Sequence, residues 1–384
     1  MSRIPFRVSC VVLLFALAMV GRTDAQPALR FSGYVMDFAA GQFPAMQGVD
    51  DAASNLARLR LRPLMELWEG GTLALEHEST LLWMSRDGVA SLAYRDIAPR
   101  QAVDLRWHPV AENKLHFTHA IDRLYLRQNV SWGTFMLGRQ RIQWGTGRIW
   151  NPTDLFHPLN PAAYDKIEKD GADAFTAKFH LGDFTDVQFV YNFRPAMDSA
   201  NVGARFRTNV EEFDLSAMAG YFDRRSVLGA DMAGNAFGAG VRAEVLWMDE
   251  SREGRGNDFV RYILGMDYQI SAELYVLMEY FRNGEGAART RDYDLGRLYL
   301  GEIVQLARSY LYLGGGYQLH PLLYATGGVN FNLNDNSLFV QASALWSTGD
   351  NSAVHVGTLL PVADTGDEYW YYPASVYVRG EFHF

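Results

Sequence analysis

The sequence has a single cysteine and, beyond its first 25 residues, no long apolar run. Because Cys10 has no second cysteine to pair with, disulfide bonds and multi-thiolate metal sites are excluded. A transmembrane helix needs roughly 18 consecutive apolar residues, and no segment after the N-terminal one reaches that length. If the chain enters a lipid bilayer, it can therefore satisfy its backbone only as a closed β-barrel.

The sequence also has no excess of basic charge, no linker and none of the common enzyme motifs. The chain carries 35 Lys and Arg against 44 Asp and Glu, a formal net charge of −9, which disfavours nucleic acid as a partner. Neither His-Glu-x-x-His nor Gly-x-Ser-x-Gly occurs. We therefore predict no enzymatic activity, no metal ion and no cofactor. No linker or low-complexity stretch divides residues 26–384, which predicts one domain there.

Residues 1–25 have the pattern of a secretory signal peptide. Arg3 and Arg7 precede the apolar run "VSCVVLLFALAMV", and small residues before Gln26 offer a cleavage site. Cys10 stands at the start of the apolar run rather than at its end, which disfavours a lipoprotein signal. We therefore predict that the chain is exported.

Apolar and polar residues alternate in many segments between residue 28 and the C-terminus. Successive side chains of an extended strand point to opposite faces, so this alternation separates the two kinds of residue. We expect strands over 28–38, 55–68, 72–84, 118–130, 134–144, 172–181, 185–193, 201–210, 213–222, 226–233, 236–248, 258–270, 273–283, 308–320, 322–333, 337–348, 352–362 and 374–384. Strands of about ten residues suit an antiparallel up-and-down transmembrane β-barrel of about 18 strands, with 16 as the alternative. We assign 100–117 to an outer loop, because a strand there would make the number odd.

Residues 236–248 indicate which face of such a barrel would meet lipid. Apolar residues from Phe237 to Trp247 occupy every second position, and the opposite face carries Arg242 and Glu244. The ten residue steps from Phe237 to Trp247 span roughly 33 Å, or roughly 25 Å when tilted by about 40°, which matches the apolar band of an outer-membrane barrel. A soluble β-sandwich is the alternative, but its outer face would be polar. We predict an apolar exterior and a polar lumen.

Arginine is the most frequent charged residue on the predicted inner faces. The candidate pore-lining residues are Arg58, Arg60, Arg62, Arg123, Arg127, Arg139, Arg141, Arg205 and Arg207. A guanidinium stays charged at any working pH and offers a planar fork to carboxylates or phosphates. Two interpretations remain open: these arginines pair internally with acids such as Glu244 and Glu279, or they attract anionic solutes along a pathway.

Residues 146–173 form an unusual connection after the fifth predicted strand. Its three prolines forbid regular pairing, and Trp150, Phe156 and Tyr164 make it apolar for a solvated loop. In its place and character this third outer loop resembles that of the general porins, which folds inward and narrows the channel. That resemblance implies that the acids of the loop face the arginines; these acids are Asp154, Asp165, Glu168 and Asp170. The alternative is a loop packed on the barrel mouth.

A further resemblance rests on "LGRQRIQWGTGRIWNPTDLF", residues 137–156. It is similar to the Gly-Arg-Gln strand and Asn-Pro loop of uncharacterised porin-like outer-membrane proteins and, more distantly, to alginate-export barrels. The resemblance implies that Arg139 and Arg141 are pore residues facing an anionic saccharide or another acid. It covers about 20 residues and fixes no substrate.

The C-terminal segment "SVYVRGEFHF" places Val376, Val378, Phe382 and Phe384 on one face. It resembles the terminal signal that the bacterial outer-membrane insertion machinery reads, which implies that this machinery is a partner. Together these features predict a passive channel of the Gram-negative outer membrane for small hydrophilic solutes, with anions as one candidate class. The alternative is a non-conducting barrel that acts as an enzyme or as a structural partner in an envelope complex. The sequence leaves a homotrimer open.

Overall fold

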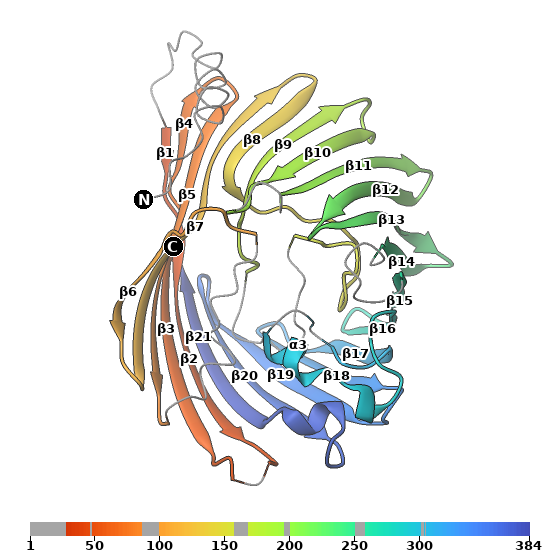
Figure 1. Cartoon of the computed structure of the whole chain (residues 1–384). Helices are drawn as coiled ribbons and strands as arrows, with labels where there is room; N and C mark the ends of the chain where they lie inside the picture. Colours follow the sequence, from red (N-terminus) through yellow and green to blue (C-terminus); the bar gives the residue numbers. More distant parts are fainter. Residues whose placement is uncertain are drawn as a thin grey trace.

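The computed structural model describes residues 28–46, 48–86, 100–156, 168–195, 200–249, 258–300, 303 and 305–384. In these ranges the chain forms one large sheet that curls round and closes into a barrel, as Figure 1 shows in a view into its interior. The closing pair is β2 (Gly33–Phe43) with β21 (Ala374–His383), in register from Tyr34↔His383 to Phe43↔Ala374. Within the described ranges, no helix has the length and hydrophobicity that crossing a bilayer would require.

Neighbouring strands of the ring are antiparallel and follow one another along the chain. Two ring strands are interrupted: β1 (Ala28–Arg30) continues into β2, and β3 (Ala52–Leu61) continues into β4 (Leu64–Trp68). The other ring strands are β5 (Gly71–Met84), β7 (Leu115–Val130), β8 (Gly133–Gln140), β9 (Ala172–His180), β10 (Asp186–Asn192), β11 (Asn201–Val210), β12 (Phe213–Phe222), β13 (Arg225–Ala236), β14 (Ala239–Met248), β15 (Phe259–Gln269), β16 (Leu274–Asn283), β17 (Ser309–His320), β18 (Leu323–Asn332), β19 (Leu338–Gly349), β20 (Ser352–Val362) and β21. The ring therefore has 18 strands, and the predicted fold class is confirmed.

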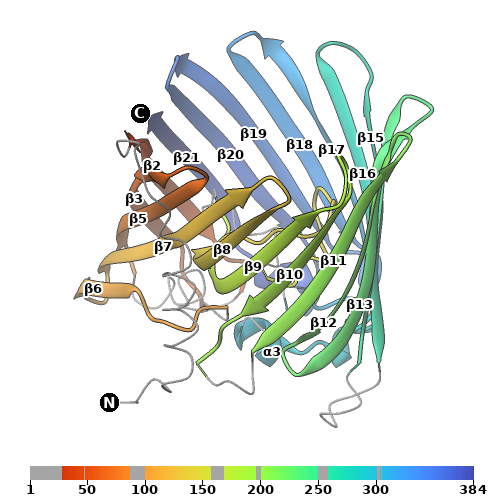
Figure 2. The same ribbon diagram turned by 90° about the horizontal axis from the view of Figure 1, so that it is seen from above.

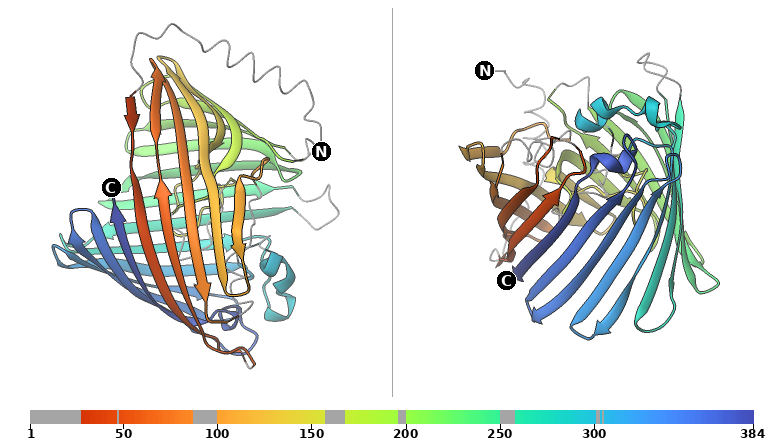
Figure 3. Two further views of the ribbon diagram at one scale, coloured as in Figure 1. Left: turned by 90° about the vertical axis from the view of Figure 1, so that its left-hand side faces the viewer. Right: turned by 90° about the horizontal axis from the view of Figure 1, so that it is seen from below.

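The region 100–117 holds one short strand, β6 (Arg106–Ala111). It pairs only with the first half of β7, whose second half pairs with β8. β6 therefore lies along the same edge of β7 as β8 and is visible at the edge of the wall in Figure 3. The prediction that 100–117 is wholly a loop is wrong, because this region holds β6 and the first residues of β7, although β6 adds no strand to the ring of 18.

The prediction of a strand over 134–144 is wrong at its C-terminal end, because β8 ends at Gln140. Ile142 and Trp144, which are 2% and 0% exposed, pack inside the barrel instead of continuing the wall. The Trp144 ring centroid lies 5.2 Å from that of Phe156 and 6.1 Å from that of Phe222. The free energy gained by burying these aromatic rings favours the inward path over a continued strand, although the sequence alternates as a strand would.

The two faces of the wall differ in polarity, but the apolar row predicted from Phe237 to Trp247 is shorter than expected, because Phe237 lies in the β13–β14 turn and β14 begins at Ala239. Leu264 is 57% exposed and Val245 is 44% exposed, whereas their chain neighbours Ile263 and Glu244 are 0% and 2% exposed. Other large apolar residues exposed on the strands are Val35, Leu81, Leu124, Leu228, Val260, Leu313, Trp346, Val356, Leu360, Val376, Val378 and Phe382. The strands that carry them run obliquely along the wall (Figure 2). Apolar side chains thus cover the exterior, and many of the charged ones are enclosed.

The long connections all lie at one end of the barrel, and most of the short ones lie at the other. The short end includes the β11–β12 turn at Glu211, where φ is 58°, and the β13–β14 turn at Phe237, where φ is 54°. The C-terminus is at this end too, since the backbone N–H of Phe384 donates to the Gly33 carbonyl at 3.0 Å. The opposite end carries the connections after β2, β5 and β8, as well as the two brief ones at 223–224 and 333–337.

Candidate functional site in the barrel interior

The chain leaves β8 and crosses the barrel interior to reach β14 and β16 (yellow trace inside the ring in Figure 1). Residues 146–153, the clamped segment, are held there by two buried wall carboxylates. Glu244 on β14 accepts hydrogen bonds from the backbone N–H of Gly147 at 2.6 Å and of Thr153 at 3.1 Å. It also accepts one from the Thr153 hydroxyl at 2.6 Å and one from the Thr146 N–H.

Glu279 on β16 holds the next part of the clamped segment. It accepts the backbone N–H groups of Arg148 at 2.9 Å, Ile149 at 3.1 Å and Trp150 at 2.7 Å. The side chain is fully buried, with 0% exposure. Because hydrogen bonds to a charged acceptor are about twice as strong as neutral ones, these contacts fix the backbone of the segment relative to the opposite wall.

The local sequence suits this tight path. A Cβ on Gly147 would lie 1.9 Å from the Trp150 carbonyl oxygen, so only glycine fits. The Asn151 side chain closes the turn, since its Oδ1 accepts from the Gly147 N–H at 3.0 Å and its Nδ2 donates to the Gly147 carbonyl at 3.1 Å. Trp150 then stacks on Phe281 of β16, with centroids 5.4 Å apart. The "GTGRIWN" motif is thus a compact turn with an aromatic anchor.

The predicted arginines of β3 lie in an ion-pair network on the wall of β3, β5 and β7. Arg60 is 2% exposed and contacts Glu76 at 2.8 Å, Glu78 at 3.0 Å and Glu168 at 2.9 Å, and it also pairs with Asp122. Oxygens of Glu76, Asp122 and Glu168 lie within 4.8 Å of one another, but this guanidinium already binds all three.

The arginines on either side of Arg60 join the same network. Arg58 pairs with Glu78 at 3.3 Å, and Arg62 pairs with Glu168. Glu168 comes from the far end of the third outer loop. The structure therefore brings one of the four predicted loop acids onto the arginines of β3.

Arg123 and Arg139 are buried rather than facing open space. Arg123 is 4% exposed and pairs with Asp122 at 2.8 Å. Arg139 is 2% exposed; its Nε donates to Asp173 at 2.7 Å and its Nη1 to the Ile121 carbonyl at 3.0 Å. Both guanidinium groups hold β7, β8 and β9 to the loops beside them.

The remaining predicted arginines are spread round the ring. Arg127 is half-buried on β7, and Arg141 is exposed just after β8, where it donates to Gln143 at 2.7 Å. On β11, Arg205 lies 3.2 Å from Asp231 and Arg207 lies 2.9 Å from Asp186. The nine predicted arginines thus form several separate groups.

The other predicted loop acids are placed differently. Asp154 is 1% exposed and pairs with Lys169. Asp170 is half-buried, near enough to Arg123 to interact with it electrostatically. Asp165 lies outside the described residues, as does the predicted signal peptide.

Glu244 and Glu279 are predicted as partners for arginine, but in the structure they accept hydrogen bonds from loop backbone. Arg148, which the clamped segment carries into the lumen, has no predicted role. The signal that points to it is the spacing of the two glycines in "WGTGR", which marks a tight turn immediately before a charged residue.

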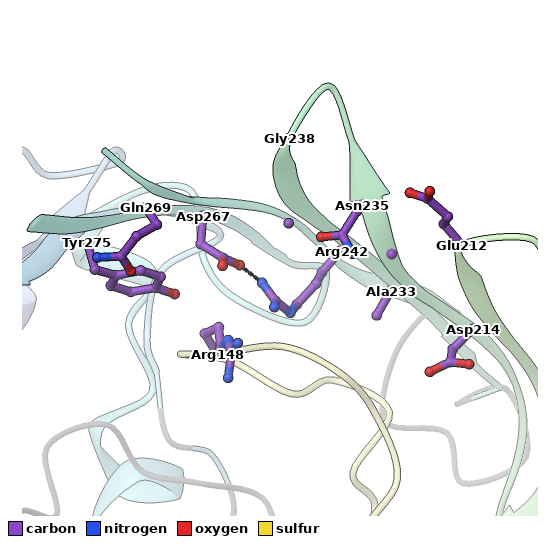
Figure 4. Close-up of a pocket in the computed structure, with 12 residues that line it drawn as sticks. Arg148, Glu212, Asp214, Ala233, Asn235, Gly238, Arg242, Asp267, Gln269 and Tyr275 are labelled. Carbon is purple, nitrogen blue, oxygen red and sulfur yellow. Dashed lines mark ion pairs between the residues drawn. The ribbon is translucent and has the colours of Figure 1, made fainter. Parts of the chain in front are cut away.

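A pocket of about 500 Å³ lies between the clamped segment and the short-turn end of β12–β16. Figure 4 shows its polar lining: Arg148 comes from the clamped segment, and Arg242 and Asp267, which form an ion pair, come from the wall. The lining residues are Arg148, Glu212, Asp214, Ala233, Gly234, Asn235, Gly238, Gly240, Arg242, Asp267, Gln269 and Tyr275.

At the long-loop end, a buried carboxylate joins three connections. Glu368, in the short 3-10 helix η4 (Glu368–Tyr371), accepts from the Tyr310 hydroxyl at 2.5 Å, Asn332 Nδ2 at 2.8 Å and the Leu306 N–H at 3.0 Å. Its own N–H donates to Asp335 at 2.9 Å. Burial raises the pKa of Glu368 to about 7, because loss of hydration outweighs these hydrogen bonds.

No protein-family model matches the sequence, and no curated protein matches it. Among solved structures, a triple mutant of the Rhodopseudomonas blastica porin is similar, with 11% identity and a TM-score of 0.49, over 93% of this chain and 100% of that one. A double mutant of the same porin has 13% identity and a TM-score of 0.49 over the same shares. This similarity is too low to assign a function, so the architecture rests on the strand pairing described above.

Proposed function

We propose that this protein is a porin-like channel of the bacterial outer membrane through which small hydrophilic solutes diffuse. The observation that supports this most is the inside-out polarity of the barrel. Apolar side chains such as Leu264 and Val356 are 57% and 51% exposed on the exterior, while Glu279 and Arg60 are enclosed at 0% and 2%. An exterior of this kind is stable in lipid, and an interior of this kind suits water and polar solutes.

We further propose that the clamped segment sets the aperture. It crosses the lumen and is fixed to β14 and β16 by Glu244 and Glu279, so it narrows the path on that side. The outward-facing Val376, Val378 and Phe382 support a role for the C-terminal strand in recognition by the insertion machinery, because they present an apolar face where lipid would lie.

Planar-bilayer recording tests the channel function. Purified protein should insert and give discrete conductance steps, and a KCl gradient should give a reversal potential that reports its ion preference. The competing function is a non-conducting barrel, which the aromatic packing of Trp144, Phe156 and Phe222 inside the ring favours. Absence of steps from protein shown to be folded and inserted would support that second function.

A further inference from the structure

The pocket beneath the clamped segment combines charge, space and hydrogen-bonding groups. Its walls come from β12 to β16, and small residues at Ala233, Gly234 and Gly240 leave its volume of about 500 Å³ free of side chains. Tyr275, Gln269 and Asn235 add a hydroxyl and two amides to the lining, as Figure 4 shows. A pocket of this size takes a small organic molecule rather than a single ion.

The two arginines of the pocket are not equivalent. Arg242 is paired with Asp267, so its charge is largely neutralised. Arg148 is exposed to the lumen and makes no ion pair with a described residue, in contrast to Arg60, Arg123 and Arg139. Arg148 and Arg242 also lie close enough to interact electrostatically. Among the described residues, the Arg148 guanidinium is therefore the cation of the lining that has no ion-pair partner, which favours an anionic group beside it.

We propose that this pocket binds small hydroxy-monocarboxylates, with the carboxylate on Arg148 and the hydroxyl groups on the polar lining. A guanidinium fork matches a carboxylate in shape and charge. Glu212 and Asp214 line the opposite side, so a solute with a second negative charge would meet repulsion there. A solute with one carboxylate and otherwise neutral polar groups suits both the Arg148 side and the acidic side of the pocket. This proposal rests on the proposed channel, because the solute reaches the pocket through the lumen.

The position of Arg148 depends on the wall carboxylates. Its backbone N–H donates to Glu279 at 2.9 Å, and the N–H of the preceding Gly147 donates to Glu244 at 2.6 Å. Glu279 and Glu244 are therefore positioning residues for the guanidinium, which is presented to the pocket without a loop rearrangement.

The test compares glycerate with glycerol, two probes of similar size of which only the first has a carboxylate. In single-channel recordings, glycerate should block the wild-type current reversibly and glycerol should not. Replacement of the guanidinium in Arg148→Gln should raise the half-blocking concentration of glycerate at least tenfold, and Arg148→Lys should give a smaller rise because the charge stays and the fork is lost. Arg291→Gln, a change at a 69% exposed loop arginine outside the pocket, is the matched control and should block like wild type.

Equal block by glycerate and glycerol, or an unchanged blocking concentration in Arg148→Gln, would overturn the carboxylate site. If the folded wild-type protein gives no current, the channel proposal fails on its own. Calorimetric titration of glycerate into detergent-solubilised protein then decides the binding site separately. Heat of binding in wild type that disappears in Arg148→Gln supports the site, and no heat in wild type refutes it.

Discussion

Removal of the Glu279 carboxylate should release the clamped segment. Three backbone N–H groups, those of Arg148, Ile149 and Trp150, donate to it at 2.7–3.1 Å. Each hydrogen bond to a charged acceptor contributes about 1.5–3 kcal/mol, but bonds to one shared group are not additive. We therefore expect Glu279→Ala to lower the local opening free energy of these amides by about 2–3 kcal/mol.

Amide hydrogen exchange followed residue by residue measures this opening directly. A loss of about 2–3 kcal/mol corresponds to exchange roughly 30–140 times faster at the three amides, since each 1.4 kcal/mol is tenfold. Glu279→Gln keeps one acceptor oxygen and should give a smaller effect. Glu273→Ala, at the exposed turn before β16, is the control and should leave these amides unchanged. Wild-type protection at all three amides in Glu279→Ala would show that the carboxylate does not hold the segment.

Three further changes test other parts of the structure. Leu264→Arg places a charge at the middle of β15 on the apolar exterior and should lower the free energy of unfolding in lipid vesicles by about 2–4 kcal/mol. Leu322→Arg, at the short-turn end, should lower it by about 0–1 kcal/mol. Equal unfolding curves for the two variants would refute the assignment of this face to lipid. Arg139→Ala leaves buried Asp173 without its cation and should lower the free energy of unfolding by about 3–5 kcal/mol. Arg141→Ala, at an exposed arginine, should change it by less than about 0.5 kcal/mol and should reduce the anion preference seen in reversal potentials. Similar chemical unfolding of the two variants would contradict the burial of Arg139. Glu368 has a pKa raised to about 7 from its ordinary 4.5, so its protonated form is favoured in the folded loops. The contribution of this group to loop stability is therefore fully present below pH 4.5 and is lost as the pH rises through about 7. Protection of the Leu306 amide, corrected for intrinsic exchange, should therefore fall between pH 5 and pH 8 in wild type and stay level in Glu368→Gln, and a level profile in wild type would refute the shift.

The ring could be predicted because a lipid-facing strand repeats its polarity every second residue. Val245 and Glu244, or Met278 and Glu279, are chain neighbours of opposite polarity and opposite exposure, and the same alternation is visible in the sequence. The ion pairs of Arg60 with Glu76 and Glu78 use the same alternation, because those acids are two residues apart on one face of β5, but neither acid was predicted as a partner of arginine.

The path of the clamped segment could not be predicted in the same way. Glu244 and Glu279 lie about 90–130 residues further along the chain than the amides whose hydrogen bonds they accept. A carboxylate that binds backbone N–H groups leaves no periodic pattern in the sequence. Asp122 was missed for a related reason. A register shift in the β5–β7 pairing between Glu76 and His77 leaves Asp122 without a partner across the ladder, and it is buried beside Arg60.

The pairing of β2 with β21 has a consequence for assembly. These strands are the first long strand and the last strand of the chain, so the seam of the ring joins residues 33–43 to residues 374–383. A chain that emerges from its N-terminus presents β2 early and can supply its partner only after every other strand has been delivered. Until then the edge of β2 is open to wrong partners, and some other surface has to shield it.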